Sequence, residues 1–371
     1  MLLATFCALP GHARAQGAPG LGGWQFGAVL DVAYTTHTLA LGGRDQGPQL
    51  GHSDLTASGP LGSWFTAKLT ATVETHERKL EGALEEAWLE TTRLPAGLQM
   101  RAGRFASQIG YLNQQHPHAD DFVERPLLYR GFYGGHWNDD GLRLNWTAPT
   151  PFYLMLGVEA FRGKRLVEET ANEPGRPGVT TFVVKTGADL GRSHSWQLGL
   201  SYIRNRREAA VEDHAEEEDE HDHDHHHGAQ FTGGKTWMID GVWKWAPDGN
   251  SRNQQLRAGF EAGRITDLNR YATPQDRDES NSIRGVWRFR PDWEVGARAD
   301  WLRVRIQHGE HFDNGLLREA ALMAVWKPSH MQSLRLQFTT QWDAVGFADP
   351  AKRTVQLQYV IAFGAHGAHA Y

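Results

Sequence analysis

The residues best suited to metal chemistry lie in one histidine–acid run, residues 212–227, with the sequence EDHAEEEDEHDHDHHH. Neutral imidazole and carboxylate groups bind Zn²⁺ and related divalent cations. The run has no fixed ligand spacing, and its composition is typical of a disordered segment. We therefore predict a disordered loop over 206–233 that binds Zn²⁺ or other divalent cations loosely; a charged surface loop that binds metal only incidentally is the alternative. The expected ligands are His214, His221, Asp222, His223, Asp224, His225, His226 and His227.

A second group of potential ligands lies in a long segment, residues 110–138, which also carries apolar and aromatic residues such as Leu127 and Tyr129. A freely solvated loop would avoid these apolar side chains, so we predict that the segment folds inward and narrows a pore. The expected constriction residues are His116, His118, Asp120, Asp121 and Phe122. His116, His118 and the two aspartates have metal-ligand chemistry, but a polar hairpin tip is the alternative. His366 and His369 form a further small cluster.

The elements that must position these residues show apolar side chains at every second position. Examples are Trp24, Phe26, Ala28, Leu30 and Val32 near the start, and Val355, Leu357, Tyr359, Ile361 and Phe363 near the end. The intervening positions are often charged or very small. A period of two predicts β-strands with one apolar face and one polar face.

The connections between these strands alternate between short turns and longer polar loops. Seven short turns rich in Gly, Pro, Asn, Asp and Ser, and eight loops, among them 76–81 and 306–314, imply about sixteen strands. The fold class predicted is therefore all-β, a transmembrane antiparallel up-and-down β-barrel. The expected strands are 24–35, 50–58, 63–75, 81–92, 97–109, 139–147, 152–163, 179–190, 194–205, 235–246, 253–264, 281–290, 292–304, 315–327, 331–343 and 353–363.

Aromatic residues gather at both ends of these strands. Trp196 and Trp326 adjoin short turns, whereas Trp237, Trp301 and Trp342 lie toward the longer loops. Two aromatic girdles at the depth of the lipid headgroups are typical of barrels in the bacterial outer membrane. We therefore expect outer-membrane lipid to surround the chain.

A barrel of sixteen strands is too wide for its own side chains to fill, and an aqueous channel results unless something plugs it. The predicted pore-lining cations are Arg101, Arg143, Lys185, Arg257, Arg298 and Arg335, which alternate with acidic residues. A wet wall with compensating charges is the simpler interpretation, since selectivity requires charges that cluster at a constriction.

The first fifteen residues contain a short apolar run that ends in Ala13-Arg14-Ala15. This pattern predicts a signal peptide over 1–15 and a barrel domain over 16–371. The chain has one cysteine, Cys7. Because Cys7 lies inside the predicted signal peptide, we expect neither a disulfide nor a cysteine metal site in the mature chain.

Several motifs resemble those of known outer-membrane families. Ala87-Trp88-Leu89-Glu90 and the segment 98–105 resemble the porin superfamily that includes the phosphate-selective porins. The segment 109–113 with His116-Pro117-His118, together with the terminus 364–371, is similar to small outer-membrane proteins described as zinc-regulated or TonB-dependent receptor-like. The resemblance implies a diffusion channel, either a homotrimer or a monomer, with a link to zinc supply.

Three functions are compatible with these observations. The first is a passive channel for small hydrophilic solutes or ions, without a required cofactor and without a nucleic-acid partner. The second is a metal receptor or metal-capturing surface protein, which would need energy coupling or a preformed site. The third is an outer-membrane hydrolase; Ser201 and His194 lie on one predicted strand but seven residues apart, so no catalytic set converges and no enzyme is expected.

We predict that deleting residues 212–227 removes several weakly bound zinc ions without affecting folding. Each ion must order its own ligands in this run, so we expect affinities of about micromolar or weaker. Imidazole must be deprotonated to bind a metal, so binding should fall as the pH drops through about 6.5. Zinc titration of both proteins at two pH values measures this. Equal zinc binding by both would place the metal elsewhere.

Overall fold

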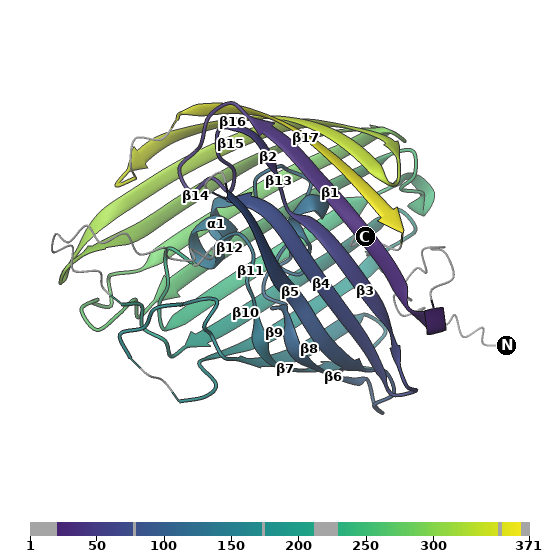
Figure 1. Cartoon of the computed structure of the whole chain (residues 1–371), viewed down its shortest axis with the longest axis horizontal. Coiled ribbons are helices and arrows are strands. Elements are labelled where there is room, and N and C mark those ends of the chain that lie inside the picture. Colours follow the sequence, from purple (N-terminus) through teal and green to yellow (C-terminus); the bar gives the residue numbers. More distant parts are fainter. Residues whose placement is uncertain (1–20, 77–78, 173–174, 211–228, 348–350, 365–371) are drawn as a thin grey trace.

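The computed structural model describes residues 21–76, 79–172, 175–210, 229–347 and 351–364. Seventeen strands form one antiparallel sheet that closes on itself where β1 pairs with β17 (Figure 1). β2 and β3 both pair with β1 and together occupy one position in the sheet, so the barrel has sixteen positions. The predicted all-β, up-and-down barrel is confirmed.

The strands have the following bounds: β1 Gln25–Thr35, β2 Gly47–Leu50, β3 Ser53–Leu61, β4 Phe65–His76, β5 Lys79–Thr91, β6 Leu98–Ala106, β7 Asn138–Thr147, β8 Tyr153–Phe161, β9 Val179–Leu190, β10 His194–Asn205, β11 Lys235–Trp245, β12 Gln255–Thr266, β13 Asp278–Arg290, β14 Trp293–His308, β15 His311–Ser329, β16 Gln332–Val345 and β17 Arg353–Gly364. Within the described ranges, the other elements are one α-helix, α1 Leu127–Tyr133, and three short 3-10 helices, η1 Leu21–Gly23, η2 Pro117–Ala119 and η3 Pro247–Gly249. Among the described residues, no helix is long and apolar enough to cross a membrane.

The two faces of the barrel wall have the distribution expected in lipid. Large apolar side chains such as Phe26 and Leu322 are 59% and 60% exposed on the outer face, whereas Glu159 and Glu319 are fully buried on the inner face. Trp293 pairs with Trp326 beside the short turns, and Trp301 pairs with Arg318 toward the loops. The outer surface is therefore an apolar band with an aromatic residue near each edge, as the sequence predicts.

Two of the predicted loops are instead parts of long hairpins. β14 and β15 pair as far as His308 with His311, so the expected loop over 306–314 shrinks to a two-residue turn. β4 and β5 pair as far as His76 with Lys79. Beyond the lipid both faces of a hairpin meet water or other loops, so polar residues there do not mark the end of a strand.

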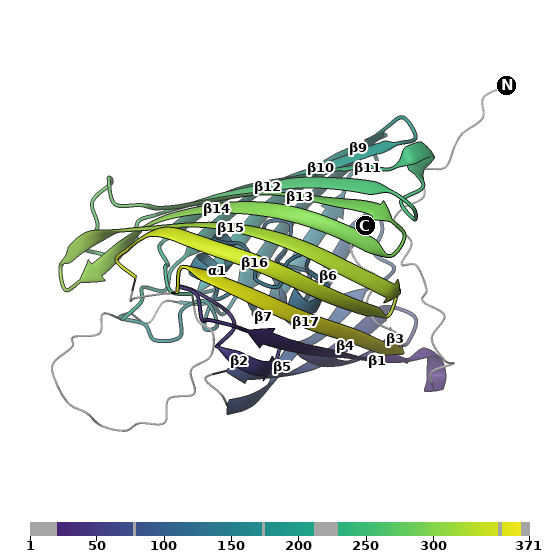
Figure 2. The same ribbon diagram turned by 90° about the horizontal axis from the view of Figure 1, so that it is seen from above.

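The segment from the last residue of β6 to the start of β7, residues 106–137, folds into the barrel, and we name it the inner loop. Its helix α1 contacts β12, β13 and β14, and both views show it inside the ring of strands (Figures 1 and 2). All seven residues of α1 are buried. The predicted signal peptide, the histidine–acid run over 212–227, and His366 and His369 lie outside the described residues.

We predict that replacing Leu322 by arginine destabilises the barrel. Leu322 pairs with Ala297, midway between the Trp293–Trp326 and Trp301–Arg318 pairs, and so lies near the middle of the bilayer. A cation on the lipid face at this depth costs about 2–4 kcal/mol. Denaturant titration in lipid vesicles measures the free energy of unfolding. Glu310→Arg, in the turn between β14 and β15, is the control and should change it little; equal losses would contradict the orientation.

Candidate functional site

Cationic side chains of the barrel wall bind the backbone of the inner loop. Arg143 Nη2 donates to the carbonyl of Ala106 at 2.6 Å, and Lys185 Nζ donates to that of Gly110 at 3.0 Å. Arg335 Nη2 donates to the Asp120 carbonyl at 2.6 Å, and Arg298 donates to that of Glu124. Charge-assisted hydrogen bonds of this kind are stronger than neutral ones. They anchor the inner loop along its length, and we name them the wall anchors.

All six cations predicted to line a pore face the lumen. Arg257 also contacts the inner loop, through the Asp121 carboxylate at 2.5 Å. Arg101 instead pairs with Glu90 at 2.6 Å and lies over the Trp88 ring. Five of the six thus contact the inner loop directly. Their predicted role in selectivity remains a prediction.

Apolar packing holds the inner loop against the same wall. Phe122 packs with Val286, Ala321, Met323 and Val325 of the inner face. Leu127 and the α1 aromatic residues belong to a larger cluster that includes wall residues such as Met238 and Leu302. The apolar residues of the segment thus fill one side of the lumen, which is the inward folding that their presence in a loop predicts.

The constriction residues that the sequence analysis grouped together separate into two places. Asp120 pairs with Arg125 at 2.6 Å, and Asp121 with Arg257. Burial raises the pKa of Asp121, but the Arg257 guanidinium outweighs burial and holds that pKa below its ordinary value. Both aspartates are thereby engaged in ion pairs. His116 and His118 lie elsewhere, beside β3 and β5.

Two irregularities in neighbouring strands turn extra polar residues into the lumen at that place. Between β2 and β3 the residues Gly51 and His52 interrupt the regular pairing with β1, and His52, Ser53 and Asp54 are all buried. In β5 the register shifts beside Thr70, so that Glu85 and Glu86 both point inward. Such bulges re-aim side chains and are common at functional sites.

Gly51 is required by this geometry. A Cβ atom there would lie 2.4 Å from the Arg44 guanidinium and 2.5 Å from the Asp31 carboxylate, which form a buried ion pair. Gly51 N also donates to the Asp31 carbonyl, and Asp31 N donates to Ser53 Oγ. This network fixes the bulge that presents His52.

His52 and Asp54 of the wall meet His116 and His118 of the inner loop, and we name these four residues the histidine site. Their ligand atoms all lie within 4.8 Å of one another. His52 Nε2 lies 3.3 Å from His116 Nδ1, and Asp54 Oδ2 lies 3.3 Å from His116 Nδ1 and 3.6 Å from His118 Nδ1. Imidazole and carboxylate are the ligands that zinc prefers. Sequence reasoning identified the two loop histidines but missed His52 and Asp54.

Glu85 and Glu86 support the histidine site. Glu85 Oε2 lies 3.1 Å from His52 Nε2 and 3.3 Å from His116 Nδ1, while Glu86 lies 3.2 Å from His116 Nε2. Burial would lower the pKa of His116, but these carboxylates outweigh burial and raise it to about 9. The surroundings therefore favour positive charge at this position.

A fourth histidine, His136, lies beside the site, and its pKa is shifted in the opposite direction. Burial lowers its pKa to about 4, so the ring is neutral at pH 7 and its Nδ1 donates to Glu85 Oε1 at 2.8 Å. Within the described part of the chain, its buried Nε2 has no hydrogen-bond partner. His136 thus orients Glu85 toward the histidine site.

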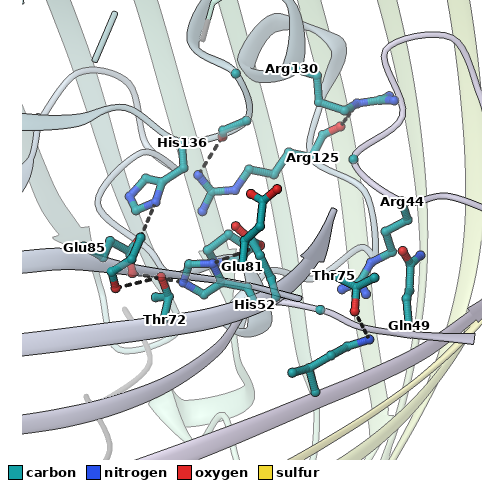
Figure 3. Close-up of a pocket in the computed structure, with 18 of the residues that line it drawn as sticks. Arg44, Gln49, His52, Thr72, Thr75, Glu81, Glu85, Arg125, Arg130 and His136 are labelled. Atoms are coloured by element: carbon teal, nitrogen blue, oxygen red, sulfur yellow. Dashed lines mark hydrogen bonds and ion pairs between the residues drawn. The ribbon is translucent and has the colours of Figure 1, made fainter. Parts of the chain in front are cut away.

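His52 of the histidine site lines a cavity of about 440 Å³, which we name the outer cavity. Residues of β2, β4, β5 and the inner loop line it, and Figure 3 shows His52 and His136 on two sides of Glu85. Side chains of His52, Asp54, His116 and His118 are 9%, 5%, 17% and 12% exposed. An ion in the outer cavity can therefore reach ligands that are otherwise shielded from bulk water.

The residues considered for a hydrolase lie far apart. Ser201 and His194 are seven residues apart on β10, about 23 Å along an extended strand, and an odd spacing puts them on opposite faces. Ser201 faces the lumen and accepts a hydrogen bond from Gly110 N at 3.4 Å, while His194 stacks on Trp243. This pair cannot act together on one substrate.

We predict that Arg298→Met lowers the free energy of unfolding by about 3–5 kcal/mol, the cost of leaving a buried charge unpaired. Arg298 pairs with Asp300 at 2.7 Å and Glu319 at 2.6 Å, and all three side chains are buried. Arg318→Met is the matched control, because its pair with Asp343 is about 40% exposed and should contribute less than about 1 kcal/mol. Denaturant titration compares them. Equal effects would show that the buried network does not hold the structure.

Comparison with known proteins shows the fold. No protein-family model matches the chain. An uncharacterized protein of Aquifex aeolicus is 28% identical over an alignment of 355 positions that covers 88% of this chain and 70% of that protein. Among solved structures, OprB of Pseudomonas putida has a TM-score of 0.58 at 13% identity, over 92% of this chain and 94% of that one.

Two further structures agree. The outer membrane channel DcaP of Acinetobacter baumannii has a TM-score of 0.54 at 12% identity, over 92% of this chain and 96% of that one. The anion-selective porin of Comamonas acidovorans has a TM-score of 0.52 at 13% identity, over 92% and 99%. The finer resemblance to zinc-regulated or TonB-dependent receptor-like proteins is not supported by these matches. The sixteen-position barrel, with its apolar outer band, is a bacterial outer-membrane protein with a porin-like fold.

Proposed function

We propose that this protein is a passive channel for small hydrophilic solutes or ions, and that divalent metal cations such as zinc are among them. The observation that carries the proposal is the outer cavity, which is lined by many charged residues, lies beside the inner loop and includes His52 of the histidine site. The homotrimer that the sequence resemblance implies is part of the same proposal.

The charges around the outer cavity favour cations. Five glutamates and four arginines line it. However, three of those arginines are neutralised by acids outside the lining set: Arg44 by Asp31, Arg125 by Asp120 and Arg130 by Glu319. The glutamates that line the cavity therefore outnumber the lining arginines that have no such acidic partner. A cleft lined by one sign of charge concentrates ions of the other sign.

Two of these glutamates face each other directly. Glu74 of β4 pairs in register with Glu81 of β5, and both line the outer cavity. Like charges at directly opposed positions destabilise a sheet unless a cation lies near them. This pair lies two positions from the end of the hairpin, where His76 pairs with Lys79, so a cation that enters from that end would meet it early.

A metal-capturing protein is the second candidate, because the histidine site could retain an ion instead of releasing it. Conduction separates the two functions. A channel requires that ions bind favourably enough to enter and weakly enough to leave. A capturing protein needs only the first property.

Single-channel recording in planar bilayers with a KCl gradient tests the channel. We expect an open conductance and a reversal potential that shows preference for K⁺ over Cl⁻. Glu74→Gln with Glu81→Gln should lower this permeability ratio by about twofold or more, because the local excess of negative charge is reduced. Glu310→Gln with Asp313→Asn, at the β14–β15 turn, removes the same charge outside the cavity and should leave the ratio unchanged. Purified protein that inserts but carries no current would reject the proposal.

A further inference from the structure

We propose that His52, Asp54, His116 and His118 form a tetrahedral site for a divalent transition-metal ion of the zinc class, inside the barrel and separate from the histidine–acid run. For its role in transport the site rests on the proposed channel. Binding itself does not require that the pore conduct. None of the three functions considered from the sequence placed a metal on His52 or Asp54.

The spacing of the ligand atoms fits a tetrahedral ion. Bonds of about 2.0–2.1 Å to zinc put neighbouring ligand atoms about 3.3–3.4 Å apart. At the centre of the site, His116 Nδ1 lies 3.3 Å from His52 Nε2 and 3.3 Å from Asp54 Oδ2. His118 Nδ1 lies 3.6 Å from Asp54 Oδ2. The remaining pairs of ligand atoms lie within 4.8 Å of each other, so side-chain rotations that move these atoms by up to about 1.4 Å would complete the four-ligand shell.

The arrangement has more acceptors than one proton can serve. His116 Nδ1 faces His52 Nε2 and carboxylate oxygens of Asp54 and Glu85, all at 3.3 Å. A single N–H donates well to only one of these three atoms. A metal ion placed between them satisfies several lone pairs at once. The geometry is therefore better suited to a metal ion than to a hydrogen bond.

Carboxylates orient the ligand rings from behind. Glu86 lies 3.2 Å from His116 Nε2, the ring nitrogen that points away from the site, and Glu74 lies 3.8 Å from His52 Nδ1. A carboxylate that accepts the second N–H of a histidine fixes the ring orientation and makes the other nitrogen a stronger ligand. Lys68 pairs with Glu86 and holds it in place.

The ligand set and the charge select the class of ion. Three imidazole nitrogens and one carboxylate suit Zn²⁺, Co²⁺ and similar ions, whereas Mg²⁺ and Ca²⁺ prefer shells of oxygen. Four carboxylates, Asp54, Glu74, Glu85 and Glu86, surround the site against one lysine, Lys68. With neutral histidines the surroundings carry a formal charge of −3, which a divalent cation partly neutralises.

The site joins the inner loop to the barrel wall, since it takes two ligands from each. His116 is the N-cap residue of η2 and His118 lies within η2, whereas His52 lies between β2 and β3 and Asp54 lies in β3. A bound ion therefore cross-links the loop to β3, a strand that carries none of the wall anchors, which lie on β7, β9, β14 and β16. Ligand binding to the folded state alone raises the unfolding temperature.

Titration of the full-length protein in detergent micelles with Co²⁺ tests the site, because tetrahedral Co²⁺ has characteristic visible absorption. We expect one ion to bind before all others with a tetrahedral spectrum. His116→Ala with His118→Ala should weaken that first ion at least about 100-fold, since loss of a single outer-sphere partner already costs about 10–100-fold. Mg²⁺ should not displace the ion, and Zn²⁺ should.

Two further variants make the result specific. His308→Ala with His311→Ala removes two histidines at the β14–β15 turn and should leave the first ion unchanged. Asp54→Asn preserves the shape of the side chain and should lower the affinity for the first ion about tenfold or more. This variant tests the site if the double histidine variant fails to fold. Unchanged affinity and spectrum in the folded His116/His118 or Asp54 variants would overturn the site and assign the ion to residues 212–227.

Conductance separates this inference from the proposed channel. Protein that binds the first ion but carries no current would reject the channel and leave the metal site standing. Protein that conducts, with first-ion binding insensitive to the substitutions, would reject the site and leave the channel. If both hold, micromolar Zn²⁺ should reduce the current of the wild type and of the His308/His311 control, but not of the His116/His118 variant.

Discussion

The structure depends on one constraint: a barrel of this width cannot fill its own lumen, and a chain folded into it must satisfy its backbone there. The wall meets this requirement with cations. Arg143, Lys185, Arg298 and Arg335 each donate to a carbonyl of the inner loop. Buried guanidinium groups are stable only when paired, so the wall also supplies Glu159 and Glu319 as partners. Loop, wall anchors and buried acids thus form one interdependent network.

This network determines where the histidine site lies. The wall anchors fix the inner loop at Ala106, Gly110, Asp120 and Glu124, so η2, with His116 and His118, has little freedom between two held points. The bulges beside Gly51 and Glu85 bring the wall ligands and carboxylates to the same depth. Neither half of the site would meet the other if the loop lay in solvent.

The fold could be predicted because alternation and turn chemistry are local signals. Phe26, Leu30 and Val32 mark the lipid face wherever the strand lies, and Trp196 and Trp326 mark its ends. The hairpin of β14 and β15 was underestimated, since polar residues beyond the lipid resemble a loop. The site was only half predicted because its ligands come from segments about sixty residues apart. The adjacent acids Glu85-Glu86 and the sequence His52-Ser53-Asp54, which break the alternation, were the available signal.

Preorganisation distinguishes the histidine site from the histidine–acid run. The composition of the run predicts disorder, so each ion would have to order its ligands there, and that loss of entropy would lower the affinity. In the barrel the ligands of the histidine site are already within 4.8 Å of one another, and Glu85, Glu86 and the wall anchors hold them there. The free-energy cost of bringing carboxylates and imidazoles together is therefore met during folding, before a metal ion binds. Weakening a remote anchor such as the bond from Arg335 to Asp120 should therefore loosen the first metal ion without touching any of its ligands.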